Sequence, residues 1–303
     1  MELKSKNYSA IDLKKEPTVK TGNPVLDGFI STDGGFVVGA SIFLTGTSGA
    51  GKTTLAYTLQ KTFEDFTTSL YSREMSASAV KQQMSRYEMG HTNSFIADKD
   101  MCSNFETYLK ELDVLKPKVV IIDSLQVIAK EDYADMSEEA AAYLIIKLLR
   151  EWTEKNGAVS IMVGHVNKDG GFEGRNTLQH MFDAHLEMIY DKKKNTRTLS
   201  WDKNRKGATG DKLYYEFGEE TILFYTAEEW RTKKDGKELS NFIEETVKSF
   251  IIMYKGHENY KAFKKEIKAE FLKKISSMSS VTNMEKVIEL AKVTQIAIEN
   301  HII

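Results

Sequence analysis

The chain has 303 residues, a formal net charge of −2 and 41% hydrophobic residues, a composition typical of globular proteins with one large or two smaller domains. So small a net charge neither demands nor excludes a nucleic-acid partner, and any basic surface has to be local. Cys102 is the only cysteine, which excludes an internal disulfide and a cysteine-based zinc site.

Neither a targeting nor a membrane-spanning segment is apparent in the sequence. The charged N-terminus lacks the apolar core of a signal peptide, and no run is long and apolar enough to cross a bilayer. We therefore expect a cytoplasmic protein with no membrane partner.

Apolar, strand-like runs alternate with helical patterns from about residue 40 to residue 225. The first predicted strands are Ser41–Thr45, Ser69–Ser72, Val119–Asp123 and Ser160–Gly164. The helices predicted between them are Thr53–Phe63, Ser76–Met89, Asn104–Leu115 and Glu138–Lys155. This alternation predicts an α/β fold with a mostly parallel sheet flanked by helices. Short polar connections predict an antiparallel extension made of His185–Tyr190, Arg197–Trp201, Lys212–Phe217 and Ile222–Tyr225.

A change of pattern after the last predicted strand indicates a second domain. The first domain is predicted to cover residues 1–230, with a lead-in over residues 1–20. Beyond a polar stretch, apolar residues recur at helical spacing, so residues 231–303 are predicted to form a small helical C-terminal domain. Its many lysines are usually only a solvated face, and a docking surface for DNA or a protein is the alternative.

The most specific motif is a phosphate-binding loop of the form G-x-x-x-x-G-K-[ST]. It consists of Gly46, Thr47, Ser48, Gly49, Ala50, Gly51, Lys52 and Thr53. The glycines let the backbone fold around phosphates with its N–H groups pointing inward. Lys52 is predicted to reach the outer phosphates of the nucleotide, and the Thr53 hydroxyl to bind Mg²⁺, with Thr54 next along the nucleotide-binding segment. The helix that follows adds the positive end of its dipole.

Three polar residues follow predicted strands and complete a candidate site. Asp123 ends one strand and is predicted to bind Mg²⁺ through water. Glu74 is placed to orient the water that attacks the γ-phosphate, although an acid that only favours a helix dipole is the alternative. His165 ends another strand and is placed to sense the γ-phosphate, whereas a purely structural histidine is the alternative.

A basic cluster, Lys203–Gly207, follows the predicted strand Arg197–Trp201. Such a cluster on a turn is usually solvated surface. The alternative is a cationic finger that neutralises charge developing on the transferred phosphoryl group.

These motifs, in this order, resemble the RecA superfamily of ATPases, and within it bacterial RadA and the DnaB-type replicative helicases. The lead-in Thr21–Asp27 with Gly34–Gly35 resembles that of RadA, and Ser72–Ser76 is similar to a DnaB segment whose glutamate is the catalytic base. Three further segments resemble RadA, namely Val163–Gly170, Leu178–Asp183 and Lys203–Gly207, and Ala208–Gly210 resembles the DnaB helicases. The sequence departs from the family at Gln83, where RadA has arginine, and at Lys206, where it has phenylalanine.

The resemblance implies a RecA-like P-loop ATPase core that works as a homo-oligomer, with a hexameric ring as the expected form. Lys203 and Arg205 would then act in trans on the nucleotide of the neighbouring subunit. Two loops, around Ala129–Ser137 and Lys168–Asn176, would face single-stranded DNA. In the second loop Lys168 and Arg175 are the candidates for phosphate contacts, and an ordinary surface loop is the alternative.

Three functions remain open from the sequence. The leading interpretation is an ATP-dependent motor that binds single-stranded DNA, a helicase or branch-migration ATPase in recombination, repair or replication. The second is a RecA-like recombinase or annealing protein in which ATP controls filament assembly. The third is an ATPase of this fold that acts on protein partners. In the first two cases the C-terminal domain could dock a replication or recombination protein.

Overall fold

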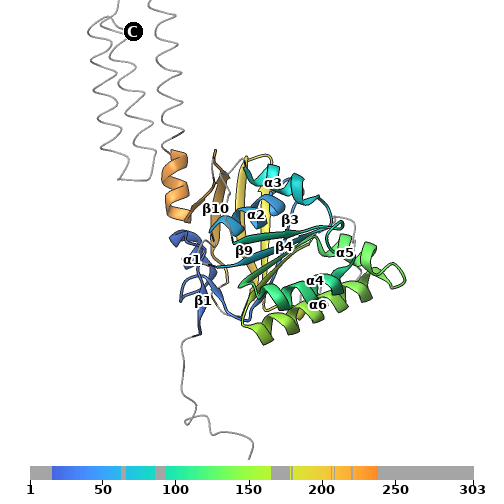
Figure 1. Cartoon of the computed structure of the whole chain (residues 1–303). Helices are drawn as coiled ribbons and strands as arrows, with labels where there is room; N and C mark the ends of the chain where they lie inside the picture. The colour runs from blue at the N-terminus through green and yellow to red at the C-terminus, as the bar shows by residue number, and fades with distance from the viewer. Residues whose placement is uncertain are drawn as a thin grey trace, which may run out of the picture. The chain divides into compact units, whose positions relative to one another are not determined.

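The computed structural model describes residues 16–62, 66–85, 93–164, 178, 180–205, 207, 209–219, 221–235 and 237. The main sheet has nine strands in the order β11-β10-β9-β8-β3-β7-β6-β4-β5 (Figure 1). These strands are β3 (Ser41–Gly46), β4 (Thr68–Ser72), β5 (Ser94–Ala97), β6 (Val119–Asp123), β7 (Val159–Val163), β8 (Ala184–Asp191), β9 (Thr196–Asn204), β10 (Lys212–Phe217) and β11 (Ile222–Tyr225).

Strand directions confirm the predicted sheet. β8, β3, β7, β6, β4 and β5 run parallel to their neighbours, and β8 to β11 pair antiparallel with one another. The β8 strand therefore joins the parallel part to the antiparallel extension. A two-stranded sheet pairs β1 (Thr18–Val19) with β2 (Phe36–Val37).

The described helices in this part of the chain are α1 (Pro24–Ile30), α2 (Lys52–Thr62), α3 (Ala77–Ser85), α4 (Phe105–Leu115), α5 (Leu125–Asp132) and α6 (Glu138–Asn156). Local signals set several of their ends. The Asn104 side chain accepts from the Thr107 N–H and caps α4, and the Ser137 side chain caps α6 in the same way. Gly157 ends α6 in the left-handed conformation, with φ 57°.

One expectation is wrong for part of its length. The segment around Ala129–Ser137 was expected to be a DNA-facing loop, but its first four residues belong to α5. Leu125, Ile128 and Ala129 recur at helical spacing and are buried, which is why this stretch folds as a helix against the core. Only residues 133–137 connect α5 to α6.

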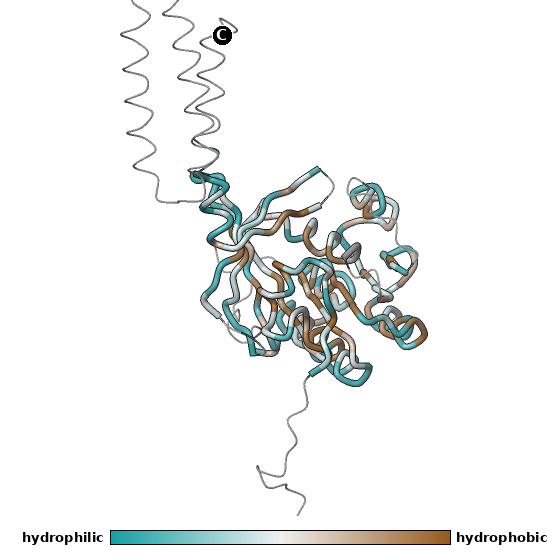
Figure 2. The backbone as a smooth tube through the Cα atoms, turned by 90° about the vertical axis from the view of Figure 1, so that its left-hand side faces the viewer, coloured by the Kyte–Doolittle hydropathy of each residue, from teal (hydrophilic) through white to brown (hydrophobic). Residues whose placement is uncertain are grey.

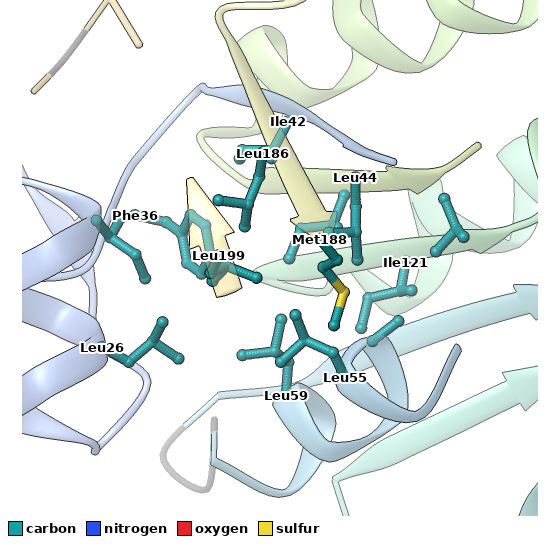
Figure 3. Packing of buried hydrophobic residues seen from close by; sticks show 14 of the residues in the cluster. Leu26, Phe36, Ile42, Leu44, Leu55, Leu59, Ile121, Leu186, Met188 and Leu199 are labelled. Atoms are coloured by element: carbon teal, nitrogen blue, oxygen red, sulfur yellow. The ribbon is translucent and has the colours of Figure 1, made fainter. Parts of the chain in front are cut away.

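The two faces of the sheet are covered by different helices. In β3, Ile42 and Leu44 face a core cluster shared with α2 and α3, while Phe43 between them faces a second cluster shared with α4, α5 and α6. Figure 1 shows α2 and α3 on one side of the sheet and α4 and α6 on the other. Figure 3 shows Leu55 and Leu59 of α2 packed toward the residues of the sheet.

Hydrophobic and hydrophilic segments are arranged accordingly. In Figure 2 the hydrophobic stretches, in brown, run mainly through the body of strands and helices, and the hydrophilic stretches, in teal, lie mainly around it. Of the described helices, none combines the length and apolar character needed to cross a membrane.

The lead-in that resembles RadA has a structural role. The buried Asp27 side chain accepts from the Thr21 N–H at 2.7 Å and from the Thr21 hydroxyl at 2.8 Å. Gly35 lies against the backbone here, since a Cβ on it would be 2.5 Å from the Val19 carbonyl oxygen. These contacts hold α1 and the β1–β2 pair together. The candidate catalytic residues lie further along the chain.

The chain divides into two compact units, residues 1–225 and 226–303. The sequence pattern set the corresponding boundary at residue 230. In the described part of the second unit, residues 227–235 are helical.

Candidate nucleotide-binding site

The phosphate loop connects the end of β3 to the start of α2. Gly46, Gly49 and Gly51 have φ of 157°, 77° and 94°, values that side-chain-bearing residues rarely adopt. The antiparallel extension holds the loop from outside. The Thr47 N–H donates to the Met188 carbonyl at 3.0 Å, and the Tyr215 hydroxyl donates to the Ala50 carbonyl at 2.8 Å.

Gly46→Ala is expected to destabilise the whole fold. A Cβ there would lie 2.1 Å from the Met188 carbonyl oxygen, a backbone atom fixed by the β3–β8 pairing. Overpacking and backbone strain together predict a loss of about 3 kcal/mol in the free energy of unfolding. Gly49→Ala is the matched control: its φ is also positive, but nothing lies within 4 Å of its Cβ position. It should cost only about 1 kcal/mol. Equal losses in urea denaturation would contradict this account of Gly46.

Lys52 is the cation of the site. Lys52 is only 8% exposed, and its ammonium donates to the Gly46 carbonyl at 3.0 Å. Burial lowers the pKa of Lys52, while the nearby carboxylates of Asp123 and Glu74 raise it. The structure therefore brings together three side chains that come from three separate motifs.

Sheet pairing places the two carboxylates. Ser72, the last residue of β4, lies opposite Asp123, the last residue of β6, and the Arg73 N–H continues the pairing to the Asp123 carbonyl at 3.1 Å. The Asp123 side chain is fully buried. Glu74 directly follows Arg73 in the chain, and its Oε1 accepts from the Ser124 hydroxyl at 2.6 Å.

Two residues of this site were missed in the sequence. Ser124 orients Glu74, and only its place directly after Asp123 could have indicated it. Tyr57 of α2 is buried, and burial followed by the charge of Asp123 raises the pKa of its hydroxyl. No sequence signal distinguishes Tyr57 from an ordinary core tyrosine.

The oxygen donors present fit Mg²⁺. Thr53 supplies a hydroxyl one position after Lys52, and Asp123 supplies a carboxylate. Within the described ranges, no group of three or more His, Cys, Asp or Glu side chains could hold a metal by itself. A site with so few protein ligands suits Mg²⁺, which keeps its waters and is bound jointly by a carboxylate or two and by substrate phosphates.

The basic residues Lys203 and Arg205 lie at the opposite end of the strands from the phosphate loop. The Arg205 guanidinium is 3.5 Å from Asp183 Oδ1, and Asp183 Oδ2 accepts from the Ser41 N–H at 3.0 Å. Lys203 donates to the Phe182 carbonyl, and burial followed by the charge of Arg205 lowers its pKa. Ser41 begins β3, whereas the phosphate loop leaves its other end, about 16 Å away at 3.3 Å per residue. Within one chain, these cations are not beside the loop.

Three predicted residues, His165, Lys168 and Arg175, lie outside the described residues. Gly164, directly before His165, is described. It follows β7, and its N–H donates to the Leu44 carbonyl at 2.8 Å.

Comparison with known proteins also supports a nucleotide-binding protein. Residues 42–175 match the family model described as an AAA domain. The DNA repair protein RadA of Salmonella typhimurium is 32% identical over 219 residues, a match that covers 69% of this chain and 45% of that protein. RadA of Escherichia coli is 31% identical with the same coverage. The chain thus spans less than half the length of these curated relatives.

A solved structure shares the fold. A KaiC-like protein of Pyrococcus horikoshii is 21% identical, with a TM-score of 0.59 over 70% of this chain and 100% of that one. At this identity the likeness concerns the fold alone. The phosphate loop at the end of β3, the RadA matches across the same sheet and the shared fold support a RecA-superfamily ATPase close to bacterial RadA.

Proposed function

We propose that this chain is an Mg²⁺- and ATP-dependent oligomeric ATPase that binds single-stranded DNA and acts as a motor in DNA repair, recombination or replication. The observation that carries the proposal is the convergence of Lys52, Glu74 and Asp123 beside the phosphate loop. The DNA substrate is inferred from the curated relatives, which are named DNA repair proteins.

In the proposed reaction, Lys52 binds the outer phosphates and balances charge as the γ-phosphoryl group leaves ADP. Glu74 accepts a proton from the attacking water while a new P–O bond forms and the bond to the β–γ bridging oxygen breaks. The Ser124 hydroxyl at 2.6 Å holds the Glu74 carboxylate for this role. Mg²⁺, held by Thr53 and Asp123, would neutralise phosphate charge.

Lys203 and Arg205 are proposed to complete the site of a neighbouring subunit. Because they lie at the opposite end of β3 from the phosphate loop, only a second copy can bring them to a nucleotide. This is a head-to-tail contact, in which one edge of each subunit meets the opposite edge of the next. Such contacts generate rings or filaments, and a hexameric ring is the form proposed here.

The DNA-binding part of the proposal rests on Lys168 and Arg175. Neutralising phosphates with such side chains releases counterions, so DNA affinity should fall steeply as salt rises.

The test is the ATPase rate with and without single-stranded DNA at several salt concentrations. We expect DNA to raise the rate by on the order of tenfold at low salt, and the effect to disappear as salt rises. Heparin of similar charge is the control, since a response to any polyanion would not indicate a DNA site. If DNA has no effect at any salt concentration, the DNA-dependent motor is wrong. Strand unwinding by closed rings supports a motor, and helical filaments that pair strands would instead indicate a recombinase.

A further inference from the structure

A buried ion pair lies directly beside Glu74 and belongs to none of the steps above. Arg73 and Asp132 are in contact, with side chains 6% and 1% exposed. The Arg73 guanidinium also donates to the Ser103 carbonyl at 2.9 Å and lies 5.4 Å from the centre of the Tyr71 ring. The Tyr71 hydroxyl donates to Asp132 Oδ2 at 3.1 Å. Both charges are therefore fixed by several partners.

Stability alone is a weak reason for this arrangement. Burying two charges costs several kcal/mol per ion before their attraction is counted, and well-packed apolar residues often do as well. The same cost is visible at Asp132, where burial raises the pKa of the carboxyl although Arg73 opposes it. What the pair does provide is a fixed geometry at the end of β4.

Helix α5 connects this pair to the candidate catalytic carboxylate. Ser124, which donates to Glu74, is the N-cap residue of α5, and Asp132, which pairs with Arg73, is its last residue. The helix α5 has eight residues and is about 12 Å long. Its N-terminal end contacts Glu74 and its C-terminal end contacts Arg73, the two consecutive residues that follow β4. A shift of α5 along its axis would move both contacts together.

We propose that Arg73 and Asp132 are positioning residues that lock α5 against the segment after β4 and so fix Glu74 for attack on the γ-phosphate. This inference rests on the proposed ATPase function. It also makes the placement of Glu74 depend on the exposed residues 134–137, because that segment follows Asp132 with only Tyr133 between them.

The experiment compares two single variants, Arg73→Met and Asp132→Leu, with the double variant that carries both changes. Each single variant leaves one buried charge without its partner and is expected to lose stability. In the double variant an apolar pair of similar size replaces the ion pair, so the melting temperature should rise above that of either single variant. It should stay short of the wild-type value, because the Tyr71 hydroxyl loses Asp132 and the Ser103 carbonyl loses Arg73. We expect its kcat to stay at least about tenfold below wild type, because Glu74 has lost its fixed position. Its KM and its affinity for a fluorescent ATP analogue should change less than about twofold, since the phosphate loop is untouched.

Two controls separate the outcomes. Lys118→Met removes a lysine that donates to the Gly157 carbonyl at 2.9 Å, away from the site, and should leave kcat unchanged. Glu74→Gln should be inactive. If the double variant regains both stability and full kcat while Glu74→Gln stays inactive, the pair is merely structural and this inference is overturned. If Glu74→Gln hydrolyses ATP at the wild-type rate, the proposed function and this inference fail together.

Discussion

Lys52→Ala is expected to abolish ATP turnover, with a fall in kcat/KM of at least about 10²–10³-fold. The ammonium interacts electrostatically with the two carboxylates of the site, and it lies in a mostly buried position where charges interact strongly. Its removal takes away the partner of the phosphates. It also removes a positive charge that favours the ionised forms of Asp123 and Glu74, and so weakens Glu74 as a base. Steady-state hydrolysis and ATP binding measure both effects.

The loss should not come from unfolding. Since burial lowers the pKa of Lys52, the fold disfavours its charged form, and removing that charge at pH 7 relieves a cost. This relief opposes the lost attraction between Lys52 and the two carboxylates, so the free energy of unfolding of Lys52→Ala is expected to stay near the wild-type value. Lys118→Ala, which removes another lysine bonded to a backbone carbonyl, is the control and should keep its full rate. Hydrolysis by Lys52→Ala at the wild-type rate would show that the site has been assigned wrongly.

Much of the fold could be predicted because its signals are local. The central strands are continuous apolar runs, and α4 and α6 end where Lys116 and Gly157 adopt the left-handed conformation. The elements α1, β5 and α5 were missed because seven, four and eight residues are too short to display a clear period. In α5 this led to the wrong expectation of a DNA-facing loop over residues 129–132.

The site could be anticipated only in part. Parallel strands end at the same edge of a sheet, so the order of the motifs is enough to bring Glu74 and Asp123 to the phosphate loop. The partners of these residues could not be found in this way. The bond from Ser124 to Glu74 and the pair of Arg73 with Asp132 join residues 50 and 59 positions apart, which no spacing rule relates. Such pairings depend on how α5 packs, and α5 itself was not predicted.

Arg205→Ala is expected to be inactive alone, with a loss in kcat of about 10³–10⁵-fold if Arg205 is a finger acting in trans. Mixed with Glu74→Gln subunits, it should regain activity. At some interfaces the Arg205→Ala subunit supplies an intact Lys52 and Glu74, while its Glu74→Gln neighbour supplies an intact Arg205. In a random equal mixture about a quarter of the interfaces are complete, so independent sites would give roughly 25% of the wild-type rate.

A second mixture tests which residues share a subunit. Glu74 and Lys52 lie together beside the phosphate loop of one chain, whereas Arg205 lies at the opposite end of β3, near Ser41. Mixing Glu74→Gln with Lys52→Ala therefore leaves every interface damaged, and no activity should return. Mixing Arg205→Ala with Lys52→Ala should restore activity as in the first case. Rescue in none of the three mixtures would argue against action in trans. Rescue between Glu74→Gln and Lys52→Ala would mean that those two residues serve different nucleotides, contrary to their placement in one protomer.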